Sequence, residues 1–101
     1  MGAGKSRPWV DVIEPHTVQL TRKAERSLRS LERTDQQRIR ATIELLSDNP
    51  RPPHCIALTG ENGVYRVRVG DFRILYEVLD EQLIILVIRI GHRRDVYRSL
   101  T

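Results

Sequence analysis

The fold is decided by the stretch VYRVRVGDFRILYEV, residues 64–78. Residues that favour β-strands flank a central Gly-Asp pair, which is typical of the two-residue turn of a type II′ hairpin. A turn of this length fixes the register of both strands: if Val69 pairs with Phe72, then Arg68 lies directly opposite Arg73. The stretch therefore predicts an antiparallel hairpin with a defined register.

Alternation along the hairpin divides its side chains between two faces. Arg66, Arg68 and Arg73 share one face, where Glu77 is the only acid on the two strands. Like charges directly opposite each other destabilise a strand pair by roughly 0.2–1 kcal/mol. We therefore interpret this face as a site for a polyanion, and a merely solvated surface stays the alternative. We expect helices to bury the other face, which carries Tyr65, Val67, Val69, Phe72, Ile74, Tyr76 and Val78.

The segment before the hairpin predicts a short strand and two amphipathic helices. The strand covers residues 17–20, and Thr21 can cap a first helix with an apolar stripe of Ala24, Leu28 and Leu31. Thr34 and Gln37 form a capping-box pattern for a second helix. That helix should bury Ile39, Ile43 and Leu46, and should stop at residues 48–50.

Three further features complete the predicted fold. Residues 49–54 contain three prolines and cannot form regular structure. Strands are expected at residues 64–69, 72–79 and 83–90, and the last is so apolar that we expect it in the middle of the sheet with both faces covered. The sequence thus predicts an α+β domain with a curved antiparallel sheet of about four strands and two helices on one face.

Length and composition limit the functional classes. The chain has 101 residues, enough for one domain, which we place at residues 17–101 after a flexible extension at 1–16. The formal net charge is +4, and all basic residues except Lys5 and Lys23 are arginine, which suits phosphate contacts, although codon bias explains this equally well. The single cysteine, Cys55, excludes an internal disulfide. No signal peptide or membrane span is recognisable, so a cytoplasmic location is expected.

A second group of polar residues follows the last predicted strand: His92, Arg93, Arg94, Tyr97 and Arg98. Histidine is the residue type that exchanges protons near neutral pH, arginines supply fixed cations, and a phenol can stack on a base. These are the parts needed to cleave RNA without a metal. No cluster of residues with metal-ligand spacing is present, so neither a metal nor a cofactor is expected.

On the segments YRVRVGDFRILYEV and VIRIGHRRDVYR, the chain resembles toxins of the RelE/ParE family over residues 17–98. The resemblance implies a domain with a strand, two helices and a three-strand meander. In the RelE branch it also implies a metal-independent endoribonuclease that enters the ribosomal A site. There it cleaves messenger RNA by attack of a 2′-hydroxyl on the adjacent phosphate.

The same resemblance implies roles for individual residues. Arg66, Arg68, Arg73, Arg93 and Tyr97 occupy the family's functional positions. The first two positions are often lysine in the family, but arginine cannot act as a base, so Arg66 and Arg68 are expected to bind RNA phosphates. Arg94 and Arg98 are assigned to the same task, and Arg73 and Arg93 are assigned to the transition state. By chemistry, His92 is the first candidate for proton transfer and Tyr97 is the second.

The resemblance further implies partners and leaves alternatives. A cognate antitoxin is expected, in a possible hetero-oligomer, together with the ribosomal A site and messenger RNA, and no membrane. The first alternative is a ParE-like inhibitor of DNA gyrase without nuclease activity. The second is an inactive module that binds RNA or a protein partner.

Overall fold

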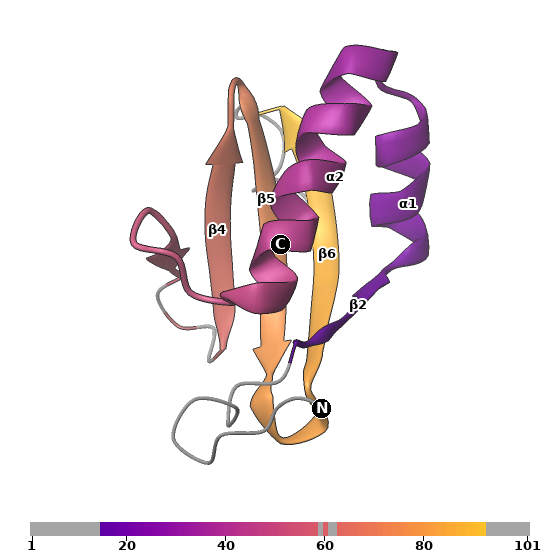
Figure 1. Ribbon diagram of the computed structural model, residues 1–101. Coiled ribbons are helices and arrows are strands. Elements are labelled where there is room, and N and C mark those ends of the chain that lie inside the picture. Colours follow the sequence, from indigo (N-terminus) through magenta and orange to yellow (C-terminus); the bar gives the residue numbers. More distant parts are fainter. Residues whose placement is uncertain (1–14, 59, 61–62, 93–101) are drawn as a thin grey trace, which may run out of the picture.

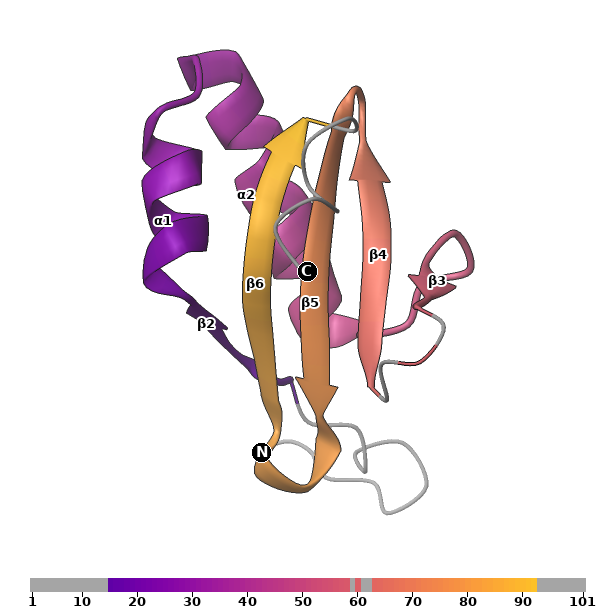
Figure 2. The same ribbon diagram turned by 180° about the vertical axis from the view of Figure 1, so that it is seen from behind.

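Two helices lie across one face of a twisted sheet in the computed structural model, which describes residues 15–58, 60 and 63–92 (Figure 1). Seen from behind, the sheet shows a second face that neither helix covers (Figure 2). The elements in chain order are β2 (Thr17–Leu20), α1 (Arg22–Arg29), α2 (Arg33–Asp48), β3 (Ile56–Ala57), β4 (Val64–Val69), β5 (Phe72–Leu79), the 3₁₀ turn η1 (Asp80–Gln82) and β6 (Ile84–His92). The α+β prediction with both helices on one face is confirmed.

The sheet has five strands in the described residues, in the order β2-β6-β5-β4-β3. The fifth is β3, a two-residue strand on the edge of β4 that was too short to recognise in the sequence. All pairs are antiparallel except β2 and β6, which run parallel. The prediction of an entirely antiparallel sheet was therefore wrong for this pair. Parallel pairing requires a long connection, and the helices that follow β2 provide it.

The hairpin of β4 and β5 has the predicted register. Val69 pairs with Phe72, Arg68 with Arg73, and Arg66 with Leu75. Gly70 has φ of +59°, and no positive φ occurs at the next residue, as a type II′ turn requires. The prediction is confirmed because a two-residue turn is specified by local sequence alone.

The core lies between the sheet and the helices, on the predicted face. The helices contribute Ala24, Leu28, Ile39, Ile43 and Leu46, all buried. The facing side chains from the strands are Val67, Val69, Ile74, Tyr76, Val78, Ile85, Val87 and Ile90, with Tyr65 and Phe72 partly buried against them. Both predicted apolar stripes are confirmed.

Strand β6 is not covered on both faces as predicted. Its buried residues alternate with partly exposed ones, because it turns only one face to the helices. Strand β5 has the continuous burial instead, with four consecutive buried residues from Arg73 to Tyr76. The apolar run in β6 thus correctly predicted an interior strand with neighbours on both sides. The prediction that both of its faces are covered was wrong.

The helix starts show one confirmed and one wrong prediction. The Thr21 hydroxyl accepts a hydrogen bond from the Ala24 amide at 3.1 Å and donates one to the Ile88 carbonyl at 2.7 Å, so it caps α1 and ties it to β6. The N-cap of α2 is Glu32, not Thr34, and it makes no side-chain cap. The capping box is therefore wrong: Gln36 instead donates to the Leu31 carbonyl at 2.8 Å and so holds the short connection between the helices.

The proline-rich segment at residues 49–54 has no helix or strand, as predicted, and side chains anchor it to the sheet. The Tyr76 hydroxyl donates to the Pro50 carbonyl at 2.7 Å. The Arg51 guanidinium donates to the Tyr65 hydroxyl at 2.8 Å and to Asp80 at 2.7 Å. The segment is thereby held at one end of the sheet.

The start of the described chain is joined to the end of α2. The Ser47 hydroxyl donates to the His16 carbonyl at 2.6 Å, and the His16 amide donates to the Ser47 carbonyl at 2.9 Å. Residues 1–14 lie outside the described residues, so the division into an extension and a domain stays a prediction. No described helix has the length and apolar character needed to cross a membrane.

The register predicts that the paired arginines weaken the hairpin. Arg68 is exposed and lies opposite Arg73, so Arg68→Glu replaces a like-charge pair with an opposite-charge pair. We expect the free energy of unfolding, measured by urea denaturation, to rise by about 0.5–1 kcal/mol. In an Arg73→Gln background the same substitution should add almost nothing. An equal effect in both backgrounds would show that the pair does not cause the gain.

Candidate nucleic-acid interface

Four arginines form two rows across the sheet face opposite the helices. In the first row, Arg66 of β4, Leu75 of β5 and Arg89 of β6 are paired in register. In the second, Arg68 pairs with Arg73, and Arg73 pairs with Gly91 of β6. Neighbouring strands lie about 4.8 Å apart, so Arg66 and Arg89 are about 10 Å apart in the first row, and Arg68 and Arg73 are about 5 Å apart in the second. We call Arg66, Arg68, Arg73 and Arg89 the arginine rows.

Exposure differs within the arginine rows. Arg68 is exposed, and Arg66 and Arg89 are partly buried. Arg73 is only 8% exposed and donates to the Phe72 carbonyl at 3.2 Å, while Leu75 is fully buried. The prediction of an open face is thus correct for Arg68 but wrong for the middle strand. There Leu75 lies between two long arginine side chains, whose stems can shield it from solvent. The burial of Arg73 restricts its guanidinium to few positions.

Arg89 was missed by the sequence analysis. Its place depends on the register between β5 and β6, which are separated by η1 and by an irregularity at Leu75/Tyr76. No local signal specifies that register. The available hint was a single arginine within a run of apolar residues, because a charge in an interior strand has to be paired or reach solvent.

His92 does not lie in the arginine rows. It pairs with Phe72, whose side chain belongs to the helix-covered face, and the two rings contact edge to face at 6.2 Å between centroids. Its imidazole is exposed at the end of β6. Together with Ser27 of α1 and with Ser30 and Leu31, which follow that helix, it lines a cavity of about 290 Å³. The other predicted site residues, Arg93, Arg94, Tyr97 and Arg98, lie outside the described residues.

The tyrosines of the described chain serve the core rather than the arginine rows. Tyr65 and Tyr76 stack with ring centroids 5.9 Å apart on the helix-covered face. Burial raises the pKa of Tyr76, which keeps its phenol protonated as the hydrogen-bond donor to the Pro50 carbonyl. Neither phenol is placed to transfer a proton on the arginine face.

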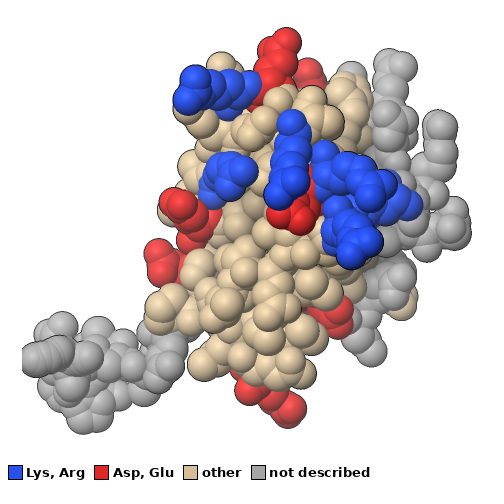
Figure 3. All heavy atoms as spheres, turned by 90° about the vertical axis from the view of Figure 1, so that its right-hand side faces the viewer, with Lys and Arg blue, Asp and Glu red and all other residues tan. Residues whose placement is uncertain are grey.

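The remaining charged surfaces are a salt-bridged cluster and a basic helix. The Arg51 guanidinium, hydrogen-bonded to Asp80, lowers the pKa of that carboxyl, and His16 lies 3.4 Å from the same side chain. Basic side chains also gather over α1 (Figure 3). They belong to Arg22, Lys23, Arg26 and Arg29, which are all exposed.

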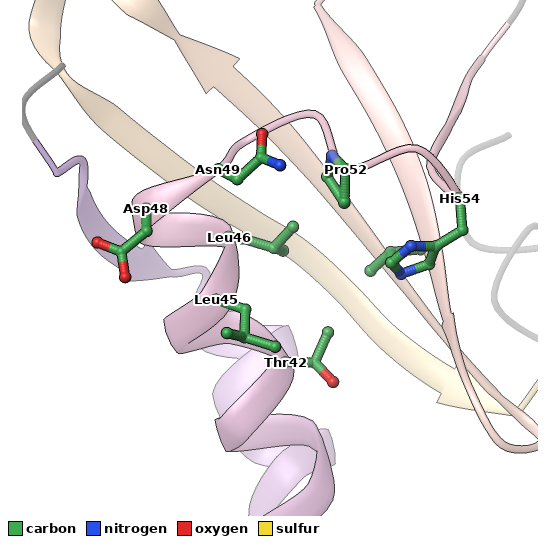
Figure 4. Close-up of a pocket in the computed structure, with 8 residues that line it drawn as sticks. Thr42, Leu45, Leu46, Asp48, Asn49, Pro52 and His54 are labelled. Atoms are coloured by element: carbon green, nitrogen blue, oxygen red, sulfur yellow. The ribbon is translucent and has the colours of Figure 1, made fainter. Parts of the chain in front are cut away.

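One apolar cavity of about 300 Å³ lies between α2 and β4 (Figure 4). It is lined by Leu45 and Leu46 of α2, by Val67 of β4 and by Pro52 of the proline-rich segment. The other lining residues are Thr42, Asp48, Asn49 and His54. It contains no lysine or arginine and has one acid, so it does not suit a phosphate. The arginine rows do have the chemistry for a polyanion: fixed cations in two ordered rows, with the Arg73 side chain held by burial.

Sequence comparison identifies the family. Residues 18–97 match the family model of the ParE toxin of type II toxin–antitoxin systems, parDE. The chain is 31% identical over 88 residues to the toxin RelG of Mycobacterium tuberculosis, an alignment that covers 83% of this chain and 98% of the relative.

Solved structures show the same fold. The toxin–antitoxin complex RelBE2 of M. tuberculosis contains a chain that superimposes with a TM-score of 0.71 at 29% identity, covering 82% of this chain and 97% of that one. The archaeal RelE–RelB complex of Pyrococcus horikoshii gives a TM-score of 0.70 at 25% identity, covering 78% and 96%. The family match, the relative and the shared fold agree: the chain belongs to the ParE toxin family and is a RelE-like toxin of a type II toxin–antitoxin system.

Proposed function

We propose that this toxin inhibits translation by cleaving messenger RNA in the A site of the ribosome. The arginine rows are the observation that carries the proposal. An extended RNA strand presents one phosphate per nucleotide, and two rows of guanidinium groups can contact several of them at once. A toxin that only bound a protein target would have no chemical need for this arrangement.

The reaction is an attack of the 2′-hydroxyl on the adjacent phosphorus. A bond from the 2′-oxygen to phosphorus forms, the bond to the 5′-oxygen breaks, and negative charge builds on the phosphoryl oxygens. We assign Arg66, Arg68 and Arg89 to the RNA backbone and Arg73 to the developing charge. The limited freedom of Arg73 supports this role, because a preorganised cation needs little rearrangement during the reaction. Arg93 is assigned to the same charge, and Arg94 and Arg98 to RNA phosphates.

Proton transfer needs a group outside the arginine rows, since arginine remains protonated. His92 and Tyr97 are the candidates, as base for the 2′-hydroxyl or acid for the 5′-oxygen. His92 lies at the end of β6, next to Gly91 in the second row. Bound RNA that crosses this strand end would bring the imidazole and the phosphate together.

A cognate antitoxin is part of the proposal. The solved relatives from M. tuberculosis and P. horikoshii are toxin–antitoxin complexes. We infer that this chain also forms a hetero-oligomer with an antitoxin, which keeps it inactive in the cytoplasm until translation is to be arrested.

The direct test is inducible expression in bacteria, followed by mapping of new RNA 5′ ends. We expect cuts inside translated messages that disappear when translation initiation is blocked. Arg73→Ala and Arg93→Ala should lower the cleavage rate by about a hundred- to thousandfold and abolish growth arrest at matched expression. Arg33→Gln, at an exposed position on α2, is the control and should remain toxic.

Three outcomes would contradict the proposal. Intact messages together with gyrase trapped on broken DNA would identify a gyrase inhibitor, the alternative that the name of the matched family keeps open. Full toxicity of Arg73→Ala and Arg93→Ala would remove the catalytic assignment. Ribosome binding without cleavage or toxicity would identify an inactive module.

The assignment of the proton carrier has its own test. We expect His92→Gln to slow cleavage on programmed ribosomes by about 10²–10⁴-fold. Tyr97→Phe serves as the comparison. A wild-type rate in His92→Gln, with loss in Tyr97→Phe, would transfer the role to Tyr97.

A further inference from the structure

The outer surface of α1 carries more positive charge than its fold requires. The helix RKAERSLR contains four basic residues and one acid, and only Ala24 and Leu28 are buried. Glu25 pairs with Arg29 at 3.1 Å. Arg26 has cations three or four residues away on both sides, Arg22, Lys23 and Arg29, and such like-charge pairs destabilise a helix by about 0.2–0.5 kcal/mol each.

The order of charges along α1 has mixed effects. Arg22 and Lys23 occupy the first turn, where the partial positive charge of the helix N-terminus disfavours cations, whereas Glu25 in the first turn and Arg26 and Arg29 in the last turn are placed favourably. The like charges around Arg26 are the unfavourable part, and a polyanion beside the helix would relieve them.

The chemistry of this surface fits RNA better than a protein. A shallow hollow of about 290 Å³ is lined by Arg22, Glu25, Arg26 and Arg29, which offers three guanidinium forks to phosphates. Stable protein interfaces are organised around buried apolar or aromatic anchors. The large apolar side chains exposed in the described chain are Leu45, Ile56 and Leu83, and none belongs to α1.

The surface of α1 is next to the arginine rows. In both ribbon views α1 lies beside β6 at the side of the sheet away from β4 (Figures 1 and 2). Arg89 belongs to the first arginine row and also lines the cavity that Ser27 of α1 shares with the end of β6. The arginine rows lie on the face opposite the helices, so the basic surface of α1 adjoins them around the β6 side of the sheet.

We propose that α1 is a second RNA-binding surface, separate from the cleavage site, that holds the toxin on the ribosome through Arg22, Lys23, Arg26 and Arg29. The inference rests on the proposed function for its ribosomal setting. The phosphates come either from ribosomal RNA or from a further stretch of the message. In both cases α1 sets the affinity for the ribosome, and the arginine rows act on the message.

The test compares two double variants with the same change in net charge. Arg22→Gln/Arg26→Gln alters α1, and Arg33→Gln/Arg40→Gln alters exposed arginines of α2 as the control. Binding of each full-length toxin to purified bacterial 70S ribosomes is measured by sedimentation at several salt concentrations. Losing two phosphate contacts should reduce the slope of log affinity against log salt by roughly 1.5. We expect this reduction, with about tenfold weaker binding at low salt, in the α1 variant and wild-type behaviour in the control.

Ribosomes with an empty A site and ribosomes programmed with message separate the two sources of phosphate. A loss on both would assign α1 to ribosomal RNA, and a loss only on programmed ribosomes would assign it to the message. Equal losses in both double variants, or wild-type binding by the α1 variant, would overturn the proposal. Cleavage is scored separately, so ribosome binding through α1 without any cleavage would refute the proposed nuclease and leave the α1 inference standing.

Discussion

The two-residue turn at Gly70 and Asp71 is the constraint on which the rest of the structure depends. Because Gly70 has a positive φ, the strands leave the turn with Val69 opposite Phe72, and every later pair follows. A shift of one residue would send Arg73 and its neighbours to the opposite faces of the sheet. The same turn therefore decides which side chains fill the core and which arginines stand in rows.

The arginine face lowers stability, and the core must supply the difference. Arg68 and Arg73 lie directly opposite each other on β4 and β5, where like charges destabilise a strand pair. The opposite face offsets this with continuous packing of Val67, Ile74 and Tyr76 against α2 and its neighbours. Helix α1 shows the same pattern on a smaller scale. Ala24 and Leu28 are its buried residues, and four of the charged residues on its outer surface are basic. Both surfaces place like charges close together, and a polyanionic partner would relieve that repulsion.

Features set by local sequence could be predicted, and features set by distant pairing could not. The hairpin register, the cap at Thr21 and the stripe of Ile39, Ile43 and Leu46 each depend on a few neighbouring residues. Arg89 was missed, and His92 was grouped with the arginines, because the register of β5 with β6 passes through η1 and an irregularity at Leu75/Tyr76. The parallel pairing of β2 with β6 depends on helix packing, which residues 17–20 do not encode. The toxin class was predicted from the family resemblance. Composition and charge alone indicate only a partner with negative charge.

The central claim is that RNA lies on the sheet face opposite the helices. The most direct measurement is zero-length ultraviolet crosslinking of the toxin to message on programmed ribosomes, using RNA with a 2′-deoxy nucleotide at the cleavage position so that the complex persists. Mass spectrometry then identifies the crosslinked peptides. The account predicts crosslinks at residues of β4, β5 and β6 that share a face with Arg66, Arg68 and Arg89. Crosslinks confined to the apolar cavity between α2 and β4, with none on the arginine rows, would contradict it.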